Sequence, residues 1–149
     1  MNPLLRLGVA FVATAAVAGA APADVRAGSI TVSDAWSRPT AAGMPMGVAY
    51  FVVRNDGATD DAIVSASTPA AAHVEIHQTT LADGMARMRP LREIVVPAKA
   101  RVAVTPGGIH LMLVDLAAPL AAGTRVPLFL QFRHAGRVEI RLAVEARTE

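Results

Sequence analysis

Apolar and polar residues alternate most regularly near the end of the chain. Between 126 and 132, and again between 138 and 144, every even-numbered residue is apolar, and most residues beside them are polar. A period of two places successive side chains on opposite faces of a strand. The two segments, joined by a turn at 134–136, therefore predict an antiparallel hairpin with one wet face, which only Phe129 interrupts.

Shorter strand-like segments precede this hairpin and are separated by turns rich in Gly, Pro, Asn and Asp. They are 29–35, 48–54, 62–67, 72–79, 94–96, 101–105 and 109–113. The first alternates weakly and is predicted to be an edge strand. Residues 43–47 and 82–84 are predicted to be a loop and a turn, 85–92 a loop or short strand, and 116–124 a loop or one helical turn.

This succession of short strands predicts the fold class. No long segment has a helical period, and the sequence contains no internal repeat. Short strands with turns about every eight to twelve residues are typical of a β-sandwich or barrel. With 149 residues the chain is expected to form a single all-β domain.

Composition makes this core aliphatic and argues against one class of partner. Hydrophobic residues are 53% of the chain and aromatic residues 4%. The formal net charge is +2, and Lys99 is the only Lys among 14 basic residues. The sequence has no run of like charges and no aromatic residues interleaved with Arg. We therefore expect no nucleic-acid partner.

The N-terminus has the layout of a secretory signal peptide. Arg6 is the one charge among the first eight residues, 9–18 is an apolar run rich in Ala and Val, and small residues follow. A membrane anchor is the alternative, but a spanning helix needs about 20 strongly apolar residues. We expect cleavage of 1–23, which leaves an exported domain at 24–149 without stable membrane insertion.

Four side chains in the middle of the chain suggest a metal site. His77, Met88, His110 and Met112 supply two imidazoles and two thioethers, and the chain has no cysteine. Thioether and imidazole suit the soft ion Cu(I), whereas structural zinc sites use Cys, His and carboxylate. An electron-transfer blue copper site needs a Cys thiolate, which excludes that role. The set predicts a site for one Cu(I) ion.

The pattern around two of these ligands places them together. In 109–113 (IHLML) the odd-numbered residues can face the core, so His110 and Met112 point the other way, about 7 Å apart along the strand. His77 and Met88 are distant in sequence, so only the fold can bring them to this pair.

Several residues leave alternatives open. Methionine is most often core filler, and Met85 could compete with Met88 as a ligand. Met44 and Met46, in a Gly- and Pro-rich loop, could cover the metal, contact a partner or simply pack. His73 shares a strand face with His77 and could bind Cu(II) weakly with it. His134, in a hairpin turn, is expected to be solvated.

At the four ligands the chain closely resembles the periplasmic copper chaperone family called PCu(A)C. The family signature is H-x10-M-x21-H-x-M, and it matches His77, Met88, His110 and Met112 without a gap. The resemblance covers 28–146 and extends to AWSRPT, VEIHQT, DGMARMRPL, PGGIHLML and VPLFLQF. It implies a cupredoxin-like Greek-key β-sandwich in the periplasm that binds one Cu(I) through those residues.

The resemblance also implies a partner. It indicates supply of copper to the Cu(A) centre in subunit II of cytochrome c oxidase, often beside a thioredoxin-like copper assembly protein. Some members carry a His- and Met-rich C-terminal tail that binds more copper. This chain ends at Glu149 without such a tail, so we do not expect a second, Cu(II) site.

Three functions follow, of which the first is favoured. The chain is predicted to be a copper chaperone without enzymatic turnover. A copper-dependent redox enzyme, such as a thiol oxidase or a dismutase, would need an open site richer in nitrogen ligands. A β-sandwich module for protein contact, in which the His and Met residues are incidental, is the third reading.

Overall fold

The computed structural model describes residues 22–148. The predicted signal segment at 1–23 therefore lies almost wholly outside the described residues. All regular secondary structure between 22 and 148 is β. The strands are β1 (Val25–Ala27), β2 (Ile30–Ser37), β3 (Met46–Asn55), β4 (Asp61–Ser67), β5 (Ala71–Ala82), β6 (Met85–Pro90), β7 (Ile94–Val96), β8 (Arg101–Val104), β9 (Ile109–Leu116), β10 (Arg125–Phe132) and β11 (Arg137–Val144). No helix in this part of the chain is long and apolar enough to cross a bilayer.

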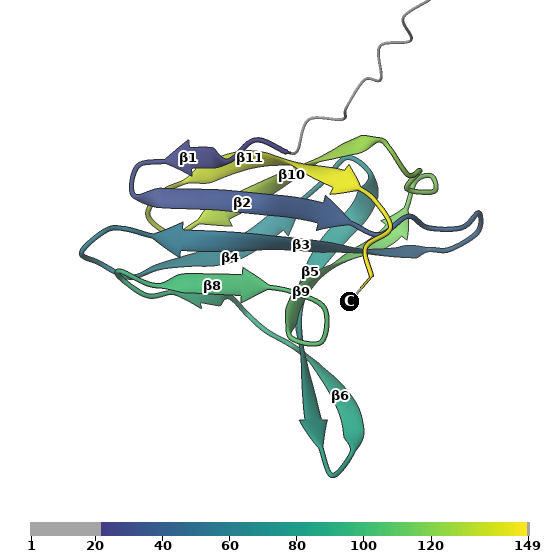
Figure 1. Ribbon diagram of the computed structural model, residues 1–149, viewed down its shortest axis with the longest axis horizontal. Coiled ribbons are helices and arrows are strands. Elements are labelled where there is room, and N and C mark those ends of the chain that lie inside the picture. Colours follow the sequence, from purple (N-terminus) through teal and green to yellow (C-terminus); the bar gives the residue numbers. More distant parts are fainter. Residues whose placement is uncertain (1–21, 149) are drawn as a thin grey trace, which may run out of the picture.

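The strands are hydrogen-bonded in the order β6-β5-β9-β3-β2-β11-β10-β4-β7, with β1 on β2 and β8 on β3. The pair β11–β2 is parallel and the other pairs are antiparallel. Strand β3 pairs with β9 through its first half and with β8 through its second half. Figure 1 shows the strands stacked in two layers, with the β5–β6 hairpin projecting below them.

The space between the layers is filled by aliphatic side chains, as the composition predicts. The largest fully buried side chains are Phe51, Phe132, Ile30, Ile63, Ile94, Leu111, Leu113, Leu128, Leu130, Ile140, Leu142 and Val32. In β10 and β11 every even-numbered residue is buried, which confirms the predicted hairpin. The Arg137 guanidinium lies 4.1 Å from the centroid of the Phe129 ring and covers the one aromatic side chain on the outer face of this hairpin.

Four expectations about the strands and loops need correction or completion. The predicted edge strand at 29–35 is β2, which lies inside the sheet between β3 and β11. Its weak alternation has a physical cause: the β2–β3 register shifts between Ser33 and Trp36, where Asp34 has a positive φ of 51°. Strand β3 begins at Met46, inside the predicted loop at 43–47. Residues 85–90 are a strand, and 116–124 contains no helical turn.

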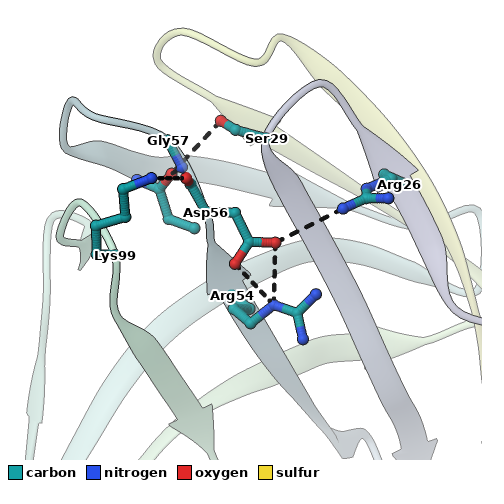
Figure 2. A network of polar contacts seen from close by, with 7 residues as sticks. Arg26, Ser29, Arg54, Asp56, Gly57 and Lys99 are labelled. Carbon is teal, nitrogen blue, oxygen red and sulfur yellow. Dashed lines mark hydrogen bonds and ion pairs between the residues drawn. The ribbon is translucent and has the colours of Figure 1, made fainter.

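Charged side chains join the loops at one end of the sandwich (Figure 2). The Asp56 carboxylate forms ion pairs with Arg26 on β1 and Arg54 on β3. The Lys99 ammonium donates to the Asp56 carbonyl oxygen. All these groups are substantially exposed, so each pair contributes little on its own. Together they tie β1, the β3–β4 turn and the β7–β8 turn to one another.

One buried carboxylate at the same end has a stronger structural role. Asp61 is only 7% exposed, and its oxygens accept hydrogen bonds from the backbone N–H groups of Ala62, His134 and Ala135 at 2.8–2.9 Å. Burial alone would raise the pKa of Asp61, but these three donors outweigh it and hold the pKa below its ordinary value. The ionised carboxylate thus fixes the β10–β11 turn on the start of β4.

We expect Asp61→Asn to lower the free energy of unfolding by about 2–3 kcal/mol at pH 7, because the amide nitrogen would face a backbone N–H. The folded-state pKa lies below the unfolded value, so this stabilisation is present above about pH 3.9 and is lost as the pH falls through the folded-state pKa. Urea unfolding at pH 7 and at acid pH measures both effects.

The exposed turn residue Asp83 supplies the control. Asp83→Asn should change the free energy of unfolding by less than about 0.5 kcal/mol. Equal effects of the two substitutions, or a difference between wild type and Asp61→Asn that does not shrink at acid pH, would contradict the role assigned to Asp61.

Candidate metal centre

The predicted ligands lie on three neighbouring strands, with β5 paired to β9 on one side and to β6 on the other. The β5–β9 register places His77 directly opposite His110, and Glu75 directly opposite Met112. Directly opposed residues of an antiparallel pair present their side chains on the same face. Leu111 and Leu113 are fully buried on the core face, so His110 and Met112 occupy the other face, as the sequence predicts.

The ring of His110 is held in one orientation. The residue is only 5% exposed, although it faces away from the core between the layers. Its Nδ1 lies 3.0 Å from the carbonyl oxygen of Gly108, in the turn that leads into β9. A carbonyl oxygen only accepts, so Nδ1 carries the proton and donates. In the neutral ring the lone pair therefore resides on Nε2.

The ring of His77 is held through its other nitrogen, Nε2, and not through Nδ1 as in His110. Its Nε2 lies 2.7 Å from the Glu75 carboxylate, and its Nδ1 is buried without a hydrogen-bond partner among the described residues. Hydrogen bonds from His77 and then His73 hold the pKa of Glu75 below its ordinary value, so the carboxylate is ionised and accepts. In the neutral ring with Nε2 protonated, Nδ1 carries the lone pair and is a buried atom that can coordinate a metal ion.

The two rings are neighbours across the β5–β9 pair. Their centroids lie 6.0 Å apart, with an angle of 36° between the ring planes. A metal–imidazole bond is about 2.0 Å long, so one ion placed between the rings is within reach of both. A buried imidazole nitrogen without a partner is costly in a folded protein, and a bound cation would satisfy it. The pair therefore fits a metal ion.

Met112 lies beside this pair on β9. It is half-buried, and it is opposite Glu75 on β5 and opposite Val48 on β3. Residues two apart on a strand are about 7 Å apart and share a face. The thioether of Met112 is thus presented on the same face as the His110 imidazole.

Met88 lies on β6, in the projecting hairpin of Figure 1. It is opposite Thr79, which shares a face with His77 two residues away on β5. The diagonal step from His77 to Met88 is about 7–8 Å between Cα atoms. The register therefore puts the fourth predicted ligand on the same face, but its side chain is 55% exposed.

The other methionines are separated by the same register. Met85 is opposite Ala82, so it occupies the other face of the hairpin from Met88. Met46 is opposite Val114, one diagonal step from Met112 on the same face, and is 37% exposed. Met44 is an exposed loop residue. Of these three, only Met46 lies on the ligand face of the sheet.

A role for Glu75 is the feature that the sequence reasoning missed. Its second oxygen accepts from His73 Nε2 at 3.1 Å, so the carboxylate joins the two imidazoles of β5. The His-x-Glu-x-His spacing, with all three residues on one strand face, was the available signal. Between residues 22 and 148 no three His, Cys, Asp or Glu side chains are grouped as a metal site. The alternative of a weak Cu(II) site at the pair His73 and His77 stays a prediction.

Comparison with known proteins identifies relatives over most of the chain. Residues 30–144 match the family model described as "Putative lipoprotein LpqE-like". The protein named "Putative lipoprotein Lxx21020", from Leifsonia xyli subsp. xyli (strain CTCB07), is 33% identical over 127 residues. That alignment covers 85% of this chain and 75% of the relative.

Solved structures match the fold as well. The copper-bound PCuAC domain from PmoF2 superposes with a TM-score of 0.73 at 26% identity, over 84% of this chain and 99% of that domain. The solution structure of CuI-DR1885 from Deinococcus radiodurans gives a TM-score of 0.63 at 25% identity, over 77% of each chain. These matches confirm the predicted cupredoxin-like fold.

The unpartnered nitrogen predicts that His77 lowers the stability of the metal-free protein. Without metal, the free energy of unfolding of His77→Leu should equal that of wild type or exceed it by up to about 1 kcal/mol. The reason is that an unsatisfied buried group is replaced by an apolar one. Chemical denaturation in the presence of a chelator measures this. Leu111→Ala on the core face is the contrast, with an expected loss of about 2–5 kcal/mol. A loss of similar size in His77→Leu would show that the imidazole is structural.

Proposed function

Because the chain belongs to the LpqE-like family and has a PCuAC-type domain, we propose that it is a periplasmic copper chaperone that binds one Cu(I) ion through His77, Met88, His110 and Met112. One observation carries the proposal more than any other: the buried Nδ1 of His77 has no partner in the described structure and lies next to the fixed ring of His110. Two thioethers occupy the same face by register.

The donor set selects the metal and its oxidation state. Two neutral imidazoles and two neutral thioethers suit Cu(I), whereas Cu(II) prefers nitrogen and oxygen in a tetragonal array. The copper-bound domain from PmoF2 and CuI-DR1885 are relatives by fold that carry copper. We extend copper binding to this chain on its similarity to them, and one Cu(I) on the chemistry of the four side chains.

Release of the ion is proposed to begin at Met88. The two imidazoles are anchored by hydrogen bonds to Gly108 and Glu75, and Met112 is half-buried. Met88 is the exposed member of the set and lies on the terminal strand of the sheet. A ligand from an acceptor protein can replace its thioether without disturbing the core. For the acceptor, we propose the Cu(A) centre in subunit II of cytochrome c oxidase or a thioredoxin-like copper assembly protein, on the family resemblance.

The rival functions are less well supported. A redox enzyme that cycles between Cu(I) and Cu(II) needs ligands suited to both states, and two of the four here are thioethers. A plain interaction module gives no reason for two hydrogen-bonded imidazoles to be neighbours, for one of their nitrogens to be buried without a partner among the described residues, or for two thioethers to lie on the same face. Catalytic consumption of superoxide or thiol by the copper-loaded protein would favour the enzyme.

We further propose that residues 1–23 are a signal peptide and that the domain functions in the periplasm. The relatives named lipoproteins are consistent with export. None of the 149 residues is a cysteine, so no lipid can be attached within them through a cysteine thiol.

Expression of the full chain in a bacterium with a periplasm should yield a soluble periplasmic product that begins at Asp24, or at Ala21 if the upstream Ala-Gly-Ala site is used. Intact-mass measurement distinguishes the two. Val12→Asp, which places a charge in the apolar run, should leave an uncleaved precursor in the cytoplasm. A periplasmic protein of wild-type sequence that retains Met1 would refute cleavage.

The copper site itself is tested by anaerobic titration of Cu(I) against a chromophoric competitor. Wild type should bind one equivalent, and His110→Ala and Met112→Leu should each weaken binding by more than about 100-fold, since even changes outside the ligand shell cost about 10–100-fold. Met88→Leu should also weaken it. Met85→Leu, on the opposite face of the same hairpin, is the matched control and should bind as wild type does. Unchanged affinity in His110→Ala and Met112→Leu would support the interaction module instead.

A further inference from the structure

The two imidazoles of the candidate centre differ in which nitrogen is available. In His110 the nitrogen nearer the backbone, Nδ1, donates to a carbonyl oxygen. In His77 the far nitrogen, Nε2, donates to a carboxylate, and Nδ1 is the buried atom without a partner among the described residues. Each ring thus has one nitrogen hydrogen-bonded to an oxygen acceptor and one available to bind a metal ion. The available nitrogen is Nε2 in His110 and Nδ1 in His77.

The geometry of β5 explains why Glu75 can select the nitrogen of His77. The two residues are two apart on the strand, so their side chains share a face about 7 Å apart at the backbone. The carboxylate extends along the strand and meets the far nitrogen of the ring at 2.7 Å. With that nitrogen occupied, the ring turns its Nδ1 inward, where the side chain is only 15% exposed.

The carboxylate is itself held in place. Its other oxygen accepts from His73 Nε2 at 3.1 Å, so both oxygens of Glu75 are engaged by imidazoles on the same strand. Met112 lies directly opposite Glu75 on β9 and offers no competing donor. Metal-bound imidazoles commonly donate their second N–H to a carboxylate or a backbone carbonyl, which fixes the tautomer and raises the basicity of the metal-binding nitrogen.

We propose that Glu75 is a positioning residue that holds His77 in the tautomer whose Nδ1 binds Cu(I), so that the ion meets the two rings through different nitrogens, Nδ1 of His77 and Nε2 of His110. This inference rests on the proposed function. It adds a residue outside the four ligands, and it specifies an asymmetric pair of nitrogen donors.

Nitrogen-15 NMR of the imidazole rings tests the assignment, because Cu(I) has a filled d shell and leaves the spectrum sharp. At a pH well above about 6.5, the metal-free protein should show His77 protonated on Nε2 and His110 protonated on Nδ1. Addition of one equivalent of Cu(I) should shift the resonances of His77 Nδ1 and His110 Nε2, while the protonated nitrogens keep their hydrogens.

Two substitutions at position 75 separate hydrogen bonding from bulk. Glu75→Gln keeps an oxygen acceptor and should preserve the tautomer, with Cu(I) affinity within a few-fold of wild type. Glu75→Val fits a strand but accepts nothing. It should give a mixture of His77 tautomers in the metal-free protein and about 10–100-fold weaker Cu(I) binding. Glu139→Val, at another exposed strand glutamate, is the control and should change neither measurement.

The outcomes distinguish the inference from the proposed function. A Cu(I)-induced shift at Nε2 of His77 in wild type, or an unchanged tautomer and affinity in Glu75→Val, would overturn the role of Glu75 and leave the copper site intact. An absence of any Cu(I)-induced shift in either ring would overturn both.

Discussion

The hydrogen-bonded register between β5 and β9 is the constraint on which the candidate centre depends. It places His77 opposite His110 and Glu75 opposite Met112. Because side chains alternate between faces, a slip of one residue would turn His110 toward the core and replace it on the outer face by Leu111 or Ile109. The core prevents such a slip, since Ile76, Leu111 and Leu113 are buried on the opposite face. The packing that stabilises the sandwich is therefore also what aligns the ligands.

The site combines a rigid part with a part that the fold leaves accessible. The His110 imidazole is buried and the His77 side chain is 15% exposed, and each ring is fixed by a hydrogen bond to an oxygen atom. Among residues 22–148 this arrangement leaves the buried Nδ1 of His77 without a hydrogen-bond partner, which is a cost that a well-packed apolar side chain would not carry. Such costs are characteristic of functional positions, where stability is given up for a preorganised site.

Much of this could be predicted from the sequence, and the reasons differ from element to element. The even-numbered apolar residues of β10 and β11 identify a hairpin because one of its faces is buried and the other is wet. The separation of His110 and Met112 from the core follows from the same alternation in β9.

The central place of β2 could not be predicted from the sequence, because the bulge near Asp34 disrupts its period. Nor could the pairing of His77 with His110, since the register between distant strands is fixed by packing of the whole core. The bridge from Glu75 to two imidazoles depends on side-chain orientation, which strand alternation limits but does not determine.

The position of Met88 explains how one site could both bind the copper ion tightly and transfer it to a partner. Strand β6 is the last strand of the sheet, and within the described residues its outer edge has no strand partner. Arg87 and Arg89 alternate with Ala86 and Met88 along this edge, and charged residues on an edge strand discourage pairing with other chains. The edge is thus kept open without becoming a site of aggregation. A flexible thioether on such an edge can leave the ion while the two imidazoles and Met112 retain it. Exchange of one ligand at a time then requires no opening of the core, so the depth of the histidines and the exposure of the methionine serve the same proposed function.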